Sequence, residues 1–234
     1  MIYSVCIFGD SISKGVVFDA TKNKYCFLKE SFAFLLEKCH PIKIYNFARF
    51  GCTISKGSDI IKKHIQELRS FDYTVLEFGG NDCDFDWAEV ADNPAEKHLC
   101  KTPLEQFRDQ YISLIGLVLE NGSKPILLNL PPIDPKRYFK WVSRGLNENN
   151  ILSFLGDVQN IFSWQSSYSR IVSELAEKYR IPLIDIRSAF LEEKDFSEYL
   201  CDDGIHPNSK GHLLISKTIE EKLAILQQKN EESP

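Results

Sequence analysis

Near its start the chain carries an apolar run that stops at a turn, Ile2-Tyr3-Ser4-Val5-Cys6-Ile7-Phe8-Gly9-Asp10-Ser11. A short apolar run without polar alternation is typical of a parallel strand that is covered on both faces. Gly9 permits a tight turn directly after the strand, and Asp10 can accept hydrogen bonds from loop amides. Such a turn would expose the Ser11 hydroxyl beyond the end of a buried strand. The tripeptide 9–11 is also common in plain loops, so its meaning depends on the rest of the chain.

Four more runs of this kind follow, and helical patterns separate them. The runs cover residues 42–47, 73–78, 125–130 and 182–186. Apolar residues recur at helical spacing within 27–36, 60–68 (with Ser58 as a possible N-cap), 107–119 and 171–179, and a last helix runs from about Ser209 towards Gln228. This alternation predicts a doubly wound α/β domain with five parallel strands. In sheets of this kind, active sites lie beyond the carboxyl ends of the strands.

The bulk composition fits one soluble domain. The chain has 234 residues, of which 43% are hydrophobic and 26% charged, and its net charge is −5. We expect a single domain over residues 1–228, followed by a frayed polar tail over 229–234. The acidic balance argues against a nucleic-acid partner, and no apolar run approaches the ~18 residues that a membrane span needs.

The N-terminal sequence and the cysteines bear on location. No basic region precedes the first apolar run, so we expect a buried strand there and not a secretion signal. The seven cysteines are an odd number without a Cys-x-x-Cys pair, which indicates reduced thiols in a cytoplasmic protein. They form no metal-like cluster with histidines, so we expect no metal.

Two long connections interrupt the regular alternation, at residues 82–102 and 131–164. The second is rich in aromatic residues, among them Trp141 and Trp164. It can be interpreted as a local helical excursion that packs on itself, or as a lid or wall over the functional site, because long loops in compact domains are often functional.

A second polar turn lies near the other end of the chain, at Asp202-Asp203-Gly204-Ile205-His206-Pro207-Asn208. An imidazole works as a general base when a carboxylate holds its other nitrogen in the right tautomer. Asp203 and His206 are three residues apart, so one turn can present both on the same side. The alternative is an acidic loop with a helix-capping Asn208 and an incidental histidine. Asp202 is a competing carboxylate.

A third polar turn follows the third predicted strand, at Phe78-Gly79-Gly80-Asn81-Asp82. Acyl transfer builds negative charge on a carbonyl oxygen, and N–H groups aimed at that oxygen stabilise it. The Asn81 side-chain amide is a suitable donor, as are the backbone N–H groups of Gly51 and Ser11. The simpler interpretation of residues 79–82 is a turn.

Taken in order, these segments resemble the consensus blocks of the SGNH (GDSL) hydrolase family. The matching residues are Gly9-Asp10-Ser11-Ile12, with Ile12 where leucine is usual; Gly51, in a short and degenerate block; Gly79-Gly80-Asn81-Asp82; and Asp203-Gly204-Ile205-His206-Pro207. The resemblance extends from Ile2 to about Leu223. It implies a flavodoxin-like three-layer α/β/α sandwich, the SGNH hydrolase fold.

The resemblance also implies a reaction. Ser11 is expected to attack an ester carbonyl, while His206 takes its proton and Asp203 orients His206. The Ser11 and Gly51 N–H groups and the Asn81 amide are expected to form the oxyanion hole. The family's mechanism needs no metal and no cofactor.

The substrate expected from the sequence is a small-molecule ester with a small acyl group, such as an O-acetyl group on a carbohydrate. Candidate substrate contacts are Asp10, Asp82, Trp87 and Trp141. Two alternatives stay open: an acyltransferase that uses the same three residues, and a noncatalytic binding protein on this fold. The sequence carries no indication of oligomeric state.

Overall fold

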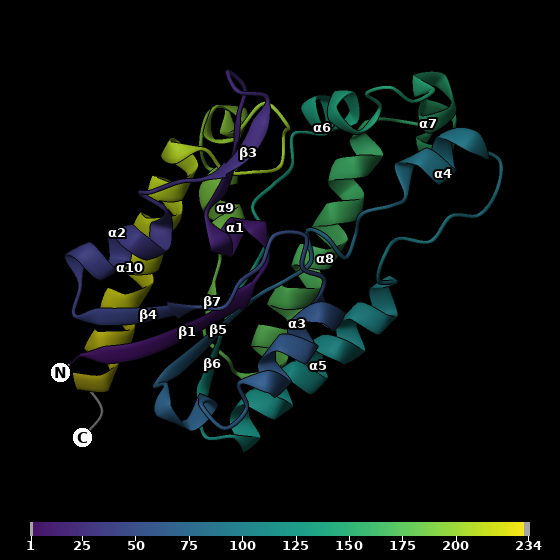
Figure 1. The fold of residues 1–234 in the computed structure, drawn as a ribbon. Helices are drawn as coiled ribbons and strands as arrows, with labels where there is room; N and C mark the ends of the chain where they lie inside the picture. Colours follow the sequence, from purple (N-terminus) through teal and green to yellow (C-terminus); the bar gives the residue numbers. More distant parts are fainter. Residues whose placement is uncertain (1, 232–234) are drawn as a thin grey trace.

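The computed structural model describes residues 2–231, in which one central sheet has helices on both faces (Figure 1). The strands lie in the order β4 (Ile42–Asn46), β1 (Tyr3–Gly9), β5 (Tyr73–Glu77), β6 (Lys124–Leu128) and β7 (Leu183–Ile184). Every pairing is parallel, and Val5 lies opposite Ile44 on one side and Tyr73 on the other. The predicted five-stranded parallel sheet is therefore confirmed.

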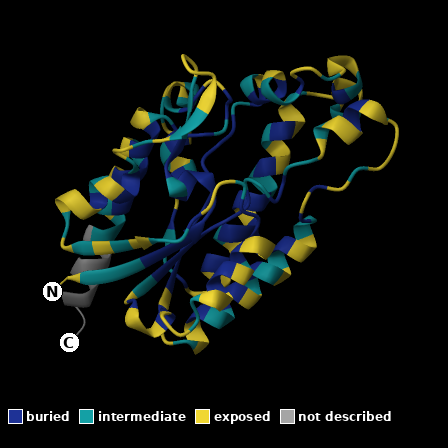
Figure 2. Ribbon diagram, in the orientation of Figure 1, coloured by how far each residue is buried: buried dark blue, intermediate teal, exposed yellow. Residues whose placement is uncertain are grey.

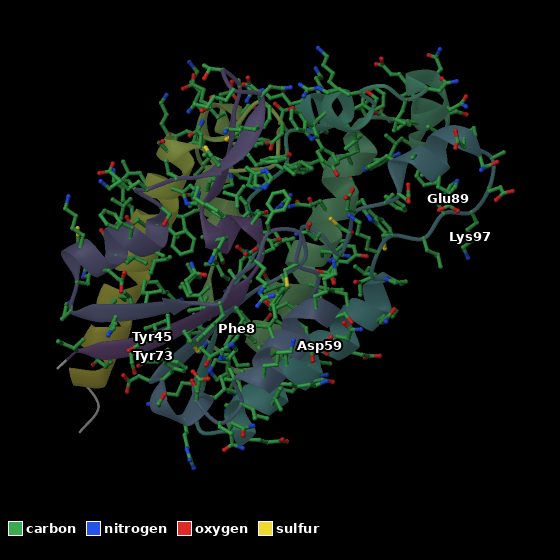
Figure 3. The ribbon with its side chains drawn as sticks, viewed as in Figure 1. Phe8, Tyr45, Asp59, Tyr73, Glu89 and Lys97 are labelled. Atoms are coloured by element: carbon green, nitrogen blue, oxygen red, sulfur yellow. The ribbon has the colours of Figure 1, made fainter. Side chains whose placement is uncertain are left out.

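Side chains alternate along each strand, so the sheet has a separate core on each face. Cys6 and Phe8 belong to one core, and Ile7 between them belongs to the other. Figure 2 shows the central strands buried along most of their length. Figure 3 marks Phe8, whose ring stacks on that of Phe47 with centroids 5.1 Å apart. Burial on both faces explains the unbroken apolar runs in the sequence.

Helices cover the two faces in two groups. The first core lies against α3 (Ile54–Lys63), α5 (Leu104–Glu120) and α8 (Gln159–Tyr179). The second lies against α2 (Phe32–Cys39), α9 (Ile186–Leu191) and α10 (Ser209–Glu231). This arrangement is the predicted three-layer α/β/α sandwich. No helix within residues 2–231 is both long and apolar enough to span a bilayer.

The two long connections fold together into a small helical unit, which we call the cap. The cap consists of α4 (Trp87–Asp92), α6 (Pro135–Val142), α7 (Glu148–Leu155) and the first turns of α8. It has a core of its own, which includes Val90, Ile133, Tyr138, Ile151 and Ile161. In Figure 1 these helices group at one end of the sheet. The interpretation of 131–164 as a helical excursion that packs on itself therefore agrees with the structure.

A β-hairpin after the first turn departs from the sequence prediction. Its strands are β2 (Val16–Asp19) and β3 (Lys24–Phe27), paired antiparallel. The apolar spacing within 27–36 predicts a helix that includes Phe27, but α2 begins only at Phe32. The Asp19 carboxylate accepts hydrogen bonds from the backbone N–H groups of Thr21 and Lys22, which closes the hairpin turn.

Two helix boundaries also differ from expectation. Helix α3 begins at Ile54 and not near Ser58, because the Asp82 carboxylate accepts the backbone N–H of Ile54 from across the fold. A short 3₁₀ segment, η1 (Leu68–Ser70), follows α3. Helix α10 continues to Glu231, three residues into the segment expected to be frayed, and 232–234 lie outside the described residues.

The contact between α3 and Phe78, the residue that follows β5, offers a test of this packing. A Cβ built on Gly57 would lie 2.3 Å from the Phe78 ring, whereas one built on Gly116 of α5 would meet nothing within 4 Å. We expect Gly57→Ala to lower the free energy of unfolding by about 1–3 kcal/mol through overpacking. The matched control Gly116→Ala should raise it by up to ~1 kcal/mol. Urea unfolding measures both. Equal stability of Gly57→Ala and the wild type would contradict the close approach of α3 to Phe78.

Candidate active site

Ser11 lies at the point in the sheet where the next strand in the chain, β4, is on one side of β1 and the later strands are on the other side. It begins α1 (Ser11–Lys14), directly after β1, which pairs with β4 on one side and β5 on the other. Asp10 caps this helical turn, since its Oδ1 accepts the backbone N–H of Ile12 at 2.9 Å. Gly15 ends the turn with a φ of 78°. The serine hydroxyl is thus held on a short, capped turn beyond the carboxyl end of a central strand.

His206 connects Ser11 with Asp203 in one chain of hydrogen bonds. His206 Nδ1 lies 2.6 Å from Asp203 Oδ2, and His206 Nε2 lies 2.9 Å from Ser11 Oγ. An ionised carboxylate can only accept, so Nδ1 carries the hydrogen and Nε2 is left to accept from the Ser11 hydroxyl. The structure therefore brings together the three residues that the sequence singled out from opposite ends of the chain.

Asp203 is held in its charged form although no solvent reaches it. Burial by itself would raise the pKa of this carboxyl group, but the hydrogen bond from His206 and its positive charge when protonated outweigh that effect. The backbone N–H groups of Ile205 and His206 also donate to Asp203 Oδ1 at 3.1 Å each. The pKa of Asp203 consequently lies below its ordinary value.

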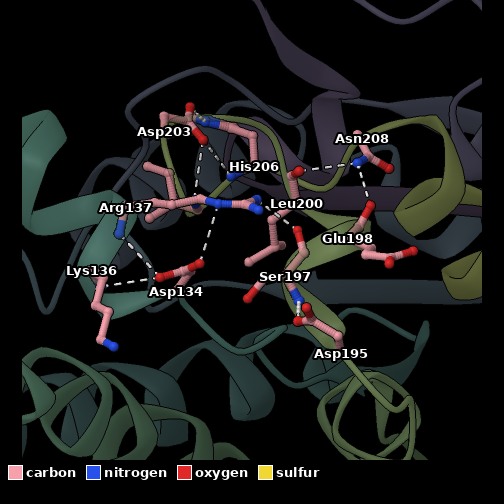
Figure 4. Close-up of polar contacts among 11 residues, drawn as sticks. Asp134, Lys136, Arg137, Asp195, Ser197, Glu198, Leu200, Asp203, His206 and Asn208 are labelled. Carbon is pink, nitrogen blue, oxygen red and sulfur yellow. Dashed lines mark hydrogen bonds and ion pairs between the residues drawn. The ribbon is translucent and has the colours of Figure 1, made fainter.

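The turn that carries Asp203 and His206 is packed against the start of α6. Gly204 has a φ of 76°, and a Cβ there would lie 2.8 Å from the Asp134 carbonyl oxygen. The Gly204 carbonyl accepts the backbone N–H of Asp134 at 2.8 Å. Arg137 of α6 donates to the Ser197 carbonyl at 2.7 Å (Figure 4). Glycine is required here because both the φ value and the close approach of α6 exclude a side chain.

On its other side, the same turn is fixed to η2 (Phe196–Tyr199). The Asn208 side-chain amide donates to the carbonyl groups of Glu198 and Leu200 (Figure 4). The His206 carbonyl accepts the backbone N–H of Cys201 at 2.7 Å. These bonds fix the backbone around His206, so its ring needs little reorganisation to face Ser11.

Asn81 and Gly51 lie beside Ser11 and line the same cavity. Asn81 follows β5, and its side-chain nitrogen donates to Asp10 Oδ2 at 3.0 Å. Gly51 has a φ of 68°, and the place where its Cβ would be is open for 4 Å around. All three candidate oxyanion donors therefore line the same cavity.

Two of the four expected substrate contacts, Asp10 and Asp82, are buried and form hydrogen bonds within the protein. Asp10 borders the cavity but is buried, and its two oxygens accept from Ile12 and Asn81. The expectation that Asp82 contacts the substrate is corrected by the structure, because Asp82 is fully buried and does not line the cavity. Its oxygens accept from the Ile54 N–H and from the Thr102 hydroxyl at 2.6 Å. Burial raises the pKa of Asp82 to about 6. Through these bonds Asp82 holds the start of α3, at Ile54, next to Thr102 at the end of the 82–102 connection.

The cavity extends from Ser11 into the cap and has a volume of about 520 Å³. The cap lines much of it, so residues 131–164 pack on themselves and also form a wall of the site. Trp87 and Trp141, the other two expected contacts, both line the cavity. The Arg144 guanidinium lies 3.9 Å from the centre of the Trp141 ring. The aromatic lining consists of Tyr25, Phe50, Phe85, Trp87, Tyr138, Trp141, Phe154 and Trp164.

Two aromatic residues that the sequence did not single out pack directly on His206. The Tyr25 ring meets it edge-on with centroids 5.1 Å apart, and the Phe50 ring lies nearly parallel to it at 6.1 Å. Tyr25 comes from β3, and its ring also lies 6.0 Å from that of Trp141. The strands of this hairpin are four residues each and mostly half exposed, so their sequence pattern is weak, and nothing local indicates that the hairpin covers the histidine.

A comparison of the sequence with models of protein families finds one match over most of the chain. Residues 7–214 match the model of the GDSL-like lipase/acylhydrolase family. The chain belongs to this family. The resemblance described from the four sequence blocks is thereby confirmed. No curated protein matches the sequence.

Solved structures share the fold of this GDSL-family chain at low sequence identity. The lipase/acylhydrolase from Enterococcus faecalis has a TM-score of 0.67 at 18% identity, with 95% of each chain covered. A variant of Axe2, an acetyl-xylooligosaccharide esterase from Geobacillus, has a TM-score of 0.66 at 18% identity, covering 94% of this chain and 93% of that one. TesA has a TM-score of 0.61 at 17% identity, covering 94% of this chain and 97% of that one.

The structural place of Asp82 can be tested in this GDSL-family protein. We expect Asp82→Asn to lower the free energy of unfolding by about 1–3 kcal/mol, because an amide turns a donor towards Ile54 N–H or Thr102 O–H. The KM for a p-nitrophenyl ester should stay within about twofold of the wild type. Urea unfolding and steady-state kinetics measure the two effects. A raised KM with unchanged unfolding would instead identify Asp82 as a substrate contact.

Proposed function

We propose that this family member is a serine esterase that cleaves acyl esters through a covalent acyl-enzyme on Ser11. The observation that supports this most is the hydrogen-bonded chain Asp203–His206–Ser11, which ends at the wall of a large cavity. A serine hydroxyl is a poor nucleophile until an adjacent base removes its proton, and His206 Nε2 is within reach of that proton.

The first half of the proposed reaction forms the acyl-enzyme. Ser11 Oγ bonds to the ester carbonyl carbon as its proton passes to His206 Nε2, and the carbonyl oxygen becomes an oxyanion. The N–H groups of Ser11, Gly51 and Asn81 are the proposed donors to this oxyanion. The bond to the leaving alcohol then breaks as His206 returns the proton to the alcohol oxygen.

The second half restores the enzyme. A water molecule takes the place of the alcohol, and His206 removes its proton as its oxygen bonds to the acyl carbon. Collapse of the second tetrahedral intermediate breaks the bond to Ser11 Oγ, which regains its proton from His206. The acid product leaves. Asp203 stays ionised throughout and stabilises the imidazolium in both halves.

The cavity favours an acyl group longer than the small one expected from the sequence. A volume of about 520 Å³ lies in the range of pockets that hold ligands far larger than an acetyl group. The polar groups of three of its aromatic residues are already hydrogen-bonded: Trp87 Nε1 and Tyr138 Oη both donate to Asp84 Oδ1, and Trp164 Nε1 donates to a backbone carbonyl. The ring faces that remain are apolar, and an acyl chain would bury them.

The substrate is a small-molecule ester, and the reaction needs no cofactor. The cytoplasmic location stays a prediction.

Labelling with a fluorophosphonate tests the nucleophile. We expect the wild type and the surface control Ser55→Ala to label, and Ser11→Ala not to. His206→Ala should lower the turnover of p-nitrophenyl acetate by at least ~10³-fold, because the serine loses its base. A wild type that does not label, or a Ser11→Ala variant that labels equally, would favour a noncatalytic binding protein.

The acyl preference can be tested with two substitutions on one helix. Leu155 of α7 lines the cavity, whereas Leu152 of the same helix is exposed and lies outside it. We expect kcat/KM for p-nitrophenyl esters to rise from acetate to octanoate in the wild type, as more apolar surface is buried. Leu155→Trp should lower the octanoate-to-acetate ratio at least fivefold, roughly the ~1 kcal/mol of one displaced methylene. Leu152→Trp should leave the ratio unchanged. A wild type that prefers acetate would restore the small-acyl hypothesis.

A further inference from the structure

A second buried carboxyl group lies beneath the candidate site and has no part in the reaction proposed above. Glu77 is the last residue of β5, and the parallel register places it opposite Gly9 of β1. Its exposed fraction is 0%, and that of its neighbour Asp10 is 1%. Two carboxyl groups side by side and out of water call for a physical explanation, because each would be costly as an isolated charge.

The hydrogen bonds of Glu77 are uneven. Its Oε2 accepts from the Ser13 hydroxyl at 2.9 Å and from the Asp10 backbone N–H at 3.3 Å. Among the described residues, none donates to its Oε1, although that atom is buried. The Glu77 and Asp10 side chains are also hydrogen-bonded to each other. A hydrogen bond between two carboxyl groups requires a proton on one of them.

The surroundings assign that proton to Glu77. The Asp10 carboxylate already accepts from the Ile12 N–H and from the Asn81 amide, and both bonds favour its charged form. Glu77 Oε2 also accepts two hydrogen bonds that favour its charged form, but burial, and then the negative charge of Asp10, outweigh them and raise the pKa of Glu77 well above its ordinary value. Burial also raises the pKa of Asp10, but the bonds from Ile12, Glu77 and Asn81 oppose that effect.

No cation neutralises the pair in place of a proton. Within residues 2–231, no lysine or arginine forms an ion pair with either carboxyl group. The other titratable groups that act on the pair are Cys52, Asp82, Tyr111 and His206. Three of these are neutral or negative, and the fourth, His206, is charged only when it is protonated. A shared proton is therefore what allows two carboxyl groups to stay buried here.

We infer that Glu77 is held as a neutral carboxylic acid whose O–H donates to the Asp10 carboxylate, and that Asp10 so fixed aims the Asn81 amide at the oxyanion site. Glu77 is then a positioning residue, which acts on the reaction through Asp10 and Asn81 and touches no substrate. The inference rests on the proposed function, because it assigns Asn81 a place in the oxyanion hole.

The hydrogen bond between Asp10 and Asn81 fixes the direction of the Asn81 amide. The Asn81 amide has two N–H bonds, and Asp10 Oδ2 accepts one of them at 3.0 Å. With that bond fixed, the direction of the second N–H is also fixed, since the amide group is planar. A carboxylate braced by Glu77 and Ile12 cannot rotate away, so the donor is oriented before charge develops on the substrate.

Two substitutions with side chains of similar size distinguish the effect of the Glu77 hydrogen bonds from the effect of its side-chain volume. Glu77→Gln keeps a donor towards Asp10 and an acceptor for the Ser13 hydroxyl, as a neutral acid does, whereas Glu77→Met keeps the length and loses both. For p-nitrophenyl ester hydrolysis, we expect Glu77→Gln to hold kcat within about threefold of the wild type. Glu77→Met should lower kcat at least ~tenfold, part of the ~10²–10³ that losing one oxyanion donor costs, with KM within about twofold. Equal kcat in the two variants would overturn the inference.

A double-mutant cycle tests whether Glu77 acts through Asn81. In the background Asn81→Ala, Glu77→Met should change kcat by less than about twofold, because the donor that it positions is already absent. A merely structural contribution of Glu77 would lower kcat by the same factor in both backgrounds, and that result would overturn the inference.

The protonation state can be measured without turnover. The infrared difference spectrum between the wild type and Glu77→Gln at neutral pH should contain the C=O band of an un-ionised carboxylic acid. A carboxylate band in its place would overturn the inference, even if Glu77→Met fails to fold. This readout also separates the two proposals: a wild type that is not labelled at Ser11 would reject the esterase and leave the infrared result unaffected.

Discussion

The parallel pairing of β1 with β5 is the constraint on which the rest of the site depends. This register sets Gly9 opposite Glu77, so the turns that follow the two strands leave the sheet side by side. Ser11 follows one strand and Asn81 the other, and the Asp10–Asn81 hydrogen bond joins the two turns. A slip by one residue would reverse the faces of every side chain on the strand and would separate these groups.

The remaining parts of the site are brought to this centre by packing from outside the sheet. The turn with Asp203 and His206 is clamped between α6 and η2, and α6 itself belongs to the cap. The cap thus has two functions, because it lines the cavity and also supports the backbone of the histidine turn. A change that loosens the core of the cap would act on the position of His206 as well as on the cavity.

Much of the fold and of the site was accessible from the sequence. Apolar runs predicted the five strands because parallel strands are buried on both faces, and the polar residues of interest were found where those runs end. Asp203 and His206 could be selected because their residue types suit one reaction at short spacing, and Asn81 because its amide follows the end of a strand. Asp82 was misassigned because a buried structural carboxylate and an exposed one look the same in a sequence. The hairpin was missed because its strands are short and half exposed, so their alternation is weak.

The sequence by itself determined the five apolar strands, the turns that carry Ser11, Asn81 and His206, and the chemical nature of each group, since these depend on local patterns. Only the tertiary structure decided which groups meet. The contacts of Tyr25 with His206, and of Glu77 with Asp10, join segments far apart in the chain and depend on strand register and helix packing. The size and apolar character of the cavity likewise arise from the cap as a whole, because no single residue encodes a volume.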